Sequence, residues 1–139
     1  MSEQENIHIV RSVFDGWNAH DAKRVVRSFD QAFVSESDTL PAPMHGPDAA
    51  QKFVEMYLRA FPDLRFTIEQ ILATGSSVIT RWHATGTHRG ELMGIAPTNR
   101  TGSVHGCTVN ELKNGKIVRE WAYWDGATLL RNIGVLPPR

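Results

Sequence analysis

An aspartate ends an aromatic segment near the C-terminus, Trp121-Ala-Tyr-Trp-Asp125. If this segment is a strand, Trp121, Tyr123 and Asp125 share one face and Glu120 lies on the other. A carboxylate beside aromatic rings is poorly solvated, which disfavours its charged form and raises its pKa. Such a group can exchange protons near neutral pH as a general acid/base. Asp125 is therefore the first catalytic candidate, and the N-cap of a following helical turn is its structural alternative.

His105 is the second catalytic candidate, because a histidine can shuttle a proton or orient a substrate oxygen. Its position depends on the register of a hairpin that turns at Asn114-Gly115. A two-residue turn pairs His105 with Trp124, on the face away from Asp125. A three-residue turn that ends in a glycine bulge places it opposite Tyr123, toward Asp125. The spacing leaves both registers open.

Six further side chains are predicted to contact a substrate: Tyr123, Trp121, Trp17, Asn18, Arg81 and His83. The aromatic pair on the last strand would stack on a planar substrate or serve as ordinary core. The end of the first helix would reach the mouth of the same pocket. Arg81 and His83 share one face of their strand. Facing inward they would bind an acidic or carbonyl oxygen, and facing outward they would lie on the surface or in a dimer interface.

Helical and strand periodicities divide the chain into two parts. Apolar residues at helical spacing and capping signals predict helices at 2–17, 21–29 and 47–61, with a short strand at 32–35. From residue 64 the period changes to two, which predicts strands at 64–71, 78–87, 104–112 and 116–125, followed by a helical turn at 126–132. Helices first and antiparallel strands afterwards indicate one α+β domain over residues 1–139.

The composition excludes several classes of function. Lysine and arginine equal aspartate and glutamate at 15 each, and no basic run occurs, so nothing suggests a nucleic-acid or membrane partner. The N-terminus lacks the features of a signal peptide, which indicates a cytoplasmic protein. The six histidines include no pair at helical ligand spacing, so we expect no metal site. Cys107 stands alone and is interpreted as an inert buried thiol.

Short motifs after residue 60 carry a family resemblance when they are taken in order. They are Ala60-Phe61-Pro62-Asp63-Leu64, Arg81-Trp82, Gly86-Thr87-His88-Arg89-Gly90, Gly94-Ile95-Ala96-Pro97-Thr98, Gly115-Lys116-Ile117, Trp121, Asp125 and Leu129-Leu130. Together they resemble the SnoaL-like polyketide (ester) cyclase family of the nuclear-transport-factor-like superfamily. The resemblance implies a conical half-barrel in which a curved antiparallel sheet wraps around N-terminal helices and encloses a deep pocket, as in the cystatin-like roll.

The resemblance also implies a function. Relatives close a ring by intramolecular aldol condensation in aromatic-polyketide (anthracycline-type) antibiotic biosynthesis, without a metal or organic cofactor, and Asp125 aligns with their acid/base. Others hydroxylate such polyketides, so a hydroxylase is the second hypothesis, and a binding module for an apolar small molecule is the third. The chain departs from the family at Ser76, Asn99 and Asn132, and many members carry His where Glu120 stands.

A homodimer or higher homo-oligomer is also expected, because a curved sheet needs its outer face covered. We expect Val78, Ala122 and Trp124 to provide the apolar cover for a partner of the same kind.

Overall fold

The N-terminal helices begin and end where local signals place them. Helix α1 (Glu3–Asn18) starts with a capping box: the Glu5 backbone N–H donates to the Ser2 hydroxyl at 3.1 Å, and the Ser2 N–H donates to the Glu5 carboxylate at 3.0 Å. Helix α2 (Ala22–Val26) is shorter than predicted and is capped by Asp21. Helix α3 (Gly46–Ala60) has a proline in its first turn, where the missing N–H costs nothing.

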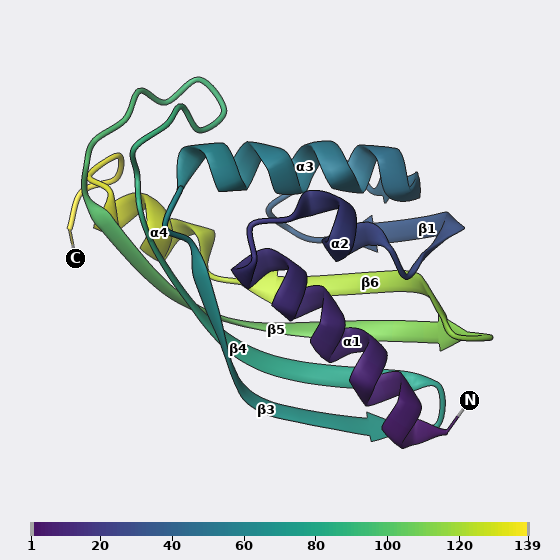
Figure 1. Ribbon diagram of the computed structural model, residues 1–139. Helices are drawn as coiled ribbons and strands as arrows, with labels where there is room; N and C mark the ends of the chain where they lie inside the picture. The colour runs from purple at the N-terminus through teal and green to yellow at the C-terminus, as the bar shows by residue number, and fades with distance from the viewer. Residues whose placement is uncertain (1, 139) are drawn as a thin grey trace.

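The computed structural model describes residues 2–138, and within them one sheet carries every strand (Figure 1). The spatial order is β2-β1-β6-β5-β4-β3. The strands are β1 (Phe29–Glu36), β2 (Met44–His45), β3 (Arg65–Thr74), β4 (Ser77–Thr87), β5 (Thr101–Lys113) and β6 (Lys116–Trp124), and α4 (Gly126–Asn132) follows β6.

The sheet is curved and unclosed, and helices α1, α2 and α3 cover one of its faces (Figure 1). Neighbouring strands are antiparallel except for β1 and β6, which pair in parallel. A parallel pair requires a long crossover connection, and here α3 and four strands separate the partners in the sequence. The predicted α+β class and curved sheet are confirmed, while this one parallel pairing departs from an all-antiparallel sheet.

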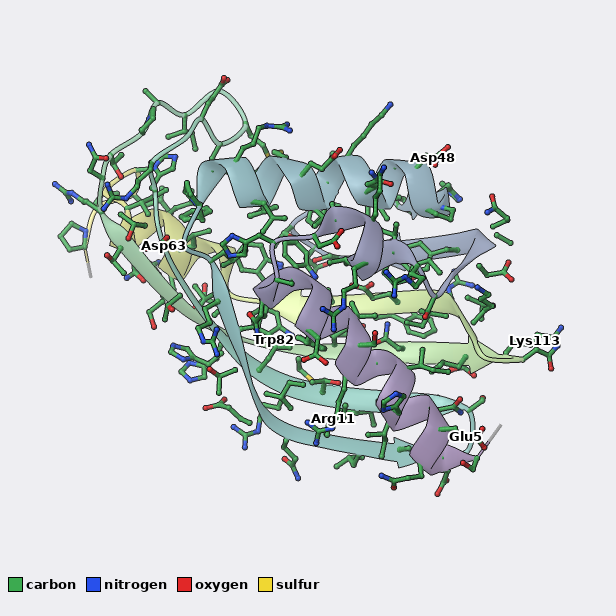
Figure 2. All side chains as sticks on the ribbon, in the orientation of Figure 1. Glu5, Arg11, Asp48, Asp63, Trp82 and Lys113 are labelled. Carbon is green, nitrogen blue, oxygen red and sulfur yellow. The ribbon has the colours of Figure 1, made fainter. Side chains whose placement is uncertain are left out.

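The long central strands alternate cleanly between the helix-covered face and the outer face. In β4 the side chains of Val78, Trp82 and Ala84 are buried. The Trp82 ring packs directly against Gly106 of β5, where a Cβ would stand 2.2 Å from the indole ring. The indole N–H donates to the Thr108 hydroxyl at 2.9 Å (Trp82 is labelled in Figure 2). The inner face of the sheet therefore presents aromatic surface with few hydrogen-bonding groups.

The β5–β6 hairpin turns at Asn114 and Gly115, as the sequence predicts. Both residues have positive φ, 51° and 77°, as a two-residue type I′ turn requires. Lys113 marks its tip in Figure 2. Beyond the turn, an irregularity between Glu111 and Leu112 shifts the register, so that Gly106 pairs with Trp124. Neither predicted register is therefore correct. The bulge shifts the pairing by one residue, so that Trp124 pairs with Gly106 and not with His105. This shift is opposite in direction to the one expected from a three-residue turn.

Candidate active site

A cavity of about 150 Å³ lies between the helix-covered face of the sheet and the helices. Its walls are largely apolar and aromatic. Phe14 and Trp17 come from α1, Tyr57 from α3, Trp82 from β4 and Trp124 from β6. Several of these rings pack on one another: the ring centroids of Trp17 and Phe66 are 5.3 Å apart in a tilted arrangement, and those of Tyr57 and Trp124 are 6.3 Å apart edge to face. Such walls suit a planar, apolar ligand.

Glu120 places a carboxyl group in this apolar cavity. It lies on the inner face of β6 with Ala122 and Trp124, and all three line the cavity. Burial raises the pKa of Glu120 from 4.5 to about 7. Within residues 2–138, no hydrogen bond or cation contributes to the shift, so loss of hydration of the charged form is its whole cause. A carboxyl group with this pKa is populated in both protonation states near neutral pH, as acid–base catalysis requires.

Two buried polar side chains flank Glu120 on the neighbouring strands. Ser35 of β1 is in register with Glu120 on one side, and Asn110 of β5 is in register on the other. Both line the cavity, and both are only 4% exposed. Tyr57 adds a hydroxyl group on the opposite wall, and its burial raises the pKa of the phenol to about 12. Tyr57 is therefore protonated over the whole physiological range.

The structure corrects the environment predicted for Asp125. Its side chain is exposed and does not line the cavity, so it is not the buried acid expected from the aromatic segment. The carboxylate caps α4: it accepts from the Thr128 N–H at 2.9 Å and from the Thr128 hydroxyl at 2.6 Å. The N-cap alternative is confirmed. Whether Asp125 also takes part in catalysis stays a prediction.

Trp121 and Tyr123 share one face of β6, and both point away from the cavity. Tyr123 is 55% exposed, and the Arg119 guanidinium lies 5.4 Å from the centroid of the Trp121 ring. Both rings line a separate, more open hollow beside the loop at residues 37–43. The predicted alternation along the strand is right, but the inward face is the opposite one, with Glu120 and Trp124. Trp121 and Tyr123 therefore do not line this cavity, and a substrate contact by either residue stays a prediction.

His105, Arg81 and His83 lie together on the outer face of the sheet. The His105 side chain is 68% exposed, and its Nε2 is 3.7 Å from the Glu69 carboxylate. Arg81 pairs with the same carboxylate at 3.1 Å, and the rings of His83 and His105 stack with centroids 4.6 Å apart. None of the three lines the cavity. The outward alternative holds for Arg81 and His83, and the register that would bring His105 to the site is not formed.

The two residues predicted at the pocket mouth, both at the end of α1, have different roles. Trp17 lines the cavity, as expected. Asn18 instead holds β3 in place: its carbonyl oxygen accepts from the Phe66 N–H at 2.7 Å, and its amide donates to the Phe66 carbonyl at 2.9 Å. Asn18 therefore positions a ring of the cavity wall without lining the cavity itself.

Sequence reasoning missed Glu120, Asn110 and Ser35 as site residues. The sequence marks Glu120 as a departure from the histidine that many family members carry, and as a residue on the face opposite Asp125. The sequence contains one indication of the position of Glu120. Residues 120, 122 and 124 share one face of a strand, so a Trp124 that faces inward places the Glu120 carboxyl group inward as well. For Asn110 and Ser35, the sequence alone offers no comparable signal.

A curved sheet that wraps around helices and encloses an apolar cavity is the ketosteroid isomerase-like class of fold. A solved protein from Catenulispora acidiphila described with that fold matches with a TM-score of 0.80 at 15% identity, over 92% of this chain and 93% of its own. None of the helices within residues 2–138 is long and apolar enough to cross a membrane.

The sequence pattern of the family described as SnoaL-like polyketide cyclase matches residues 7–133, and the chain belongs to that family. AclR from Streptomyces galilaeus, a proposed hydroxylase, is 29% identical with a TM-score of 0.88, over 99% of this chain and 86% of its own. IdmH from Streptomyces antibioticus, a proposed polyketide cyclase, is 25% identical with a TM-score of 0.79, over 94% of this chain and 99% of its own. No protein with a curated function matches. Family and neighbours together support an enzyme of polyketide chemistry.

Proposed function

We propose that this protein closes a ring in an aromatic polyketide by intramolecular aldol addition, with Glu120 as the general acid/base. One observation carries the proposal: a carboxyl group with a pKa of about 7 lies in an apolar cavity walled by aromatic rings. The cavity suits the substrate class to which the family points, and the raised pKa suits proton transfer at neutral pH. Proton transfer by a positioned side chain typically contributes about 10²–10⁴-fold to the rate.

Glu120 can carry out both proton transfers of this reaction. Its carboxylate removes a proton from the carbon next to a substrate carbonyl, and the electron pair of that C–H bond forms an enolate. The enolate carbon attacks a second carbonyl carbon of the same molecule, which forms the new C–C bond and leaves an alkoxide. Protonated Glu120 then returns its proton to the alkoxide oxygen. The product is an isomer of the substrate, and the carboxylate is regenerated.

Exchanging each carboxyl group for its amide tests the assignment and separates Glu120 from Asp125. Wild type, Glu120→Gln and Asp125→Asn are incubated with an aromatic polyketide β-keto ester of the anthracycline type, and the products are resolved by chromatography and mass spectrometry. We expect wild type and Asp125→Asn to form a product of unchanged mass, and Glu120→Gln to lose at least about 10²-fold in rate. Full activity in Glu120→Gln together with an inactive Asp125→Asn would transfer the acid/base role to Asp125.

Hydroxylation of the same class of substrate is the second candidate, and the similarity to AclR favours it. That reaction inserts one atom of dioxygen and requires two electrons from a reductant, which a partner reductase or the substrate itself would supply. Incubation under ¹⁸O-labelled dioxygen distinguishes the two reactions. Label in a heavier product supports hydroxylation, whereas an unlabelled product of unchanged mass supports cyclisation. Tight binding of the polyketide without turnover under either condition would favour a binding module.

A further inference from the structure

A row of three polar side chains crosses the largely apolar floor of the cavity. Backbone register places Ser35, Glu120 and Asn110 side by side on β1, β6 and β5. Adjacent strands are separated by about 4.8 Å, so each outer member of the row lies close to the central carboxyl group. All three side chains line the cavity. The row is therefore a polar strip facing a ligand space.

The two outer members of this row have no hydrogen-bonding partner for their side chains among the described residues 2–138. Among residues 2–138, no hydrogen bond joins the Ser35 hydroxyl or the Asn110 amide to another group, although both residues are 4% exposed. The neighbouring Thr108 differs, because its hydroxyl accepts from the Trp82 indole. Buried polar groups are almost always hydrogen-bonded. Groups that face a cavity and lack a protein partner are available to bind a polar atom of a ligand.

We propose that Asn110 and Ser35 bind the substrate oxygen on which negative charge develops when Glu120 removes a proton. The inference rests on the proposed role of Glu120. The Asn110 amide donates an N–H and the Ser35 hydroxyl donates an O–H, and neither side chain brings a charge of its own. Donors fixed in surroundings that exclude water stabilise a developing oxyanion strongly, because they need no reorganisation during the reaction. The carbonyl oxygen of an enolising ketone lies next to the carbon that loses the proton, which matches donors placed beside the base.

The size of the cavity limits the chemical class of the bound group. An engineered apolar cavity of about 150 Å³ binds benzene, and the cavity here has about the same volume. It therefore holds about one aromatic ring with its oxygen substituent. The ligand class assigned to the row is an aryl ketone or phenol whose oxygen points at Asn110 and Ser35, with the rest of a larger substrate outside.

Binding of a small phenol tests this assignment without turnover. The probe is para-nitrophenol, which ionises near neutral pH and resembles an aromatic enolate, and para-nitrotoluene is the ligand of similar shape without the oxygen. Binding is measured by calorimetry at about pH 6, where Glu120 is mainly protonated, so the phenol oxygen enters beside an uncharged carboxyl group. We expect Asn110→Leu to weaken para-nitrophenol binding about ten-fold or more, and Ser35→Ala about three- to ten-fold, with para-nitrotoluene binding unchanged.

Ser103→Ala is the matched control, because Ser103 is an exposed serine that bonds His83 away from the cavity. If Asn110→Leu does not fold, Ser35→Ala decides alone, since it removes a single oxygen atom. Unchanged para-nitrophenol affinity in the variants overturns the inference, as does an equal loss for para-nitrotoluene or no binding by wild type. The pKa of Glu120, measured separately by NMR, tests the proposed function, so a normal Glu120 pKa and an inactive donor pair are distinguishable results.

Discussion

Glu120 and Asp125 lie five positions apart, yet water reaches them very differently. Asp125 is exposed at the start of α4 and its charge is stabilised by two hydrogen bonds from Thr128. Glu120 faces the cavity, and no comparable group within residues 2–138 stabilises its charge. The residue type is therefore a poor guide to the acid/base, because surroundings decide which carboxyl group holds a proton at neutral pH.

The titration of Glu120 is the most direct test at this scale. We expect carbon-detected NMR of the side-chain carboxyl groups to show one glutamate titrating near pH 7, as burial raises the pKa of Glu120 to about 7. Its resonance is assigned by its absence in Glu120→Gln. The exposed Glu91 is the control, and Glu91→Gln should leave the displaced titration in place. A Glu120 that titrates near 4.5 would contradict the proposed acid/base.

The cap at Asp125 predicts a loss of stability that is separate from catalysis. Asp125→Ala removes the acceptor of the Thr128 N–H, so we expect the free energy of unfolding to fall by about 1 kcal/mol. Asp125→Asn keeps an acceptor oxygen and should cost less. Urea denaturation of both variants measures the difference. Equal losses, or none, would show that the hydrogen bond to Thr128 does not stabilise α4.

The sequence predicted the alternation along β6 correctly but not its inward side. Strand parity groups Trp121 with Tyr123, and it groups Glu120 with Trp124. Both groups contain an aromatic residue, so hydrophobicity does not tell which one is inside. Which face of β6 points inward depends on the bulge between Glu111 and Leu112, because the bulge sets the residues of β6 that pair with the inward residues of β5. No local sequence pattern predicts this bulge.

At the scale of elements, the close contact between β4 and β5 depends on a missing side chain. A Cβ at Gly106 would stand 2.2 Å from the Trp82 ring, so Gly106→Ala must displace the indole or the strand. We expect this overpacking to lower the free energy of unfolding by about 1–3 kcal/mol and to change the fluorescence of Trp82.

Gly126→Ala provides the control for this prediction. A Cβ at Gly126 would meet its nearest neighbour, Thr39, at 3.4 Å, which is ordinary contact. Thermal unfolding followed by tryptophan fluorescence compares the two variants. The packing account of β4 and β5 would be wrong if Gly106→Ala were as stable as Gly126→Ala.

Local signals predicted the elements well, and pairing across the chain less well. Capping at Ser2, the proline after Gly46 and the Asn114-Gly115 turn each lie where the sequence predicts a boundary. The parallel pairing of β1 with β6 joins strands more than 80 residues apart, as in Phe29 with Ile117. Such a pairing is decided by how the helices pack against the sheet, and no local pattern encodes it.

At the scale of the whole molecule, self-association stays a prediction. The residues expected to cover the outer face are inside: Val78 is fully buried, and Ala122 and Trp124 line the cavity. The outer face instead exposes Tyr123 and the half-buried Trp121, which still offer apolar surface to a second copy. We expect a dimer or larger oligomer in sedimentation at micromolar concentration, and Tyr123→Lys should weaken it. A monomeric wild type would exclude association through this face.

The stability of the whole molecule should record the cost of burying Glu120. The folded protein keeps this proton up to about pH 7, whereas the unfolded chain loses it near 4.5. Folding therefore binds a proton between these values, and the contribution of Glu120 to the free energy of unfolding falls as the pH rises through that window. The loss amounts to at most about 3 kcal/mol and is complete above pH 7.

Glu120→Gln isolates this contribution, because the amide has nearly the same shape and does not ionise. We expect the variant to be more stable than wild type by up to about 3 kcal/mol at about pH 8, and to equal it at about pH 4. Urea denaturation across this range gives the difference, and Glu91→Gln, at an exposed glutamate, is measured beside it. A difference between Glu120→Gln and wild type that does not change with pH would mean that the folded protein pays nothing to ionise Glu120. Coupled with the expected loss of turnover, a gain confined to high pH would show that this site keeps a destabilising charge because catalysis uses it.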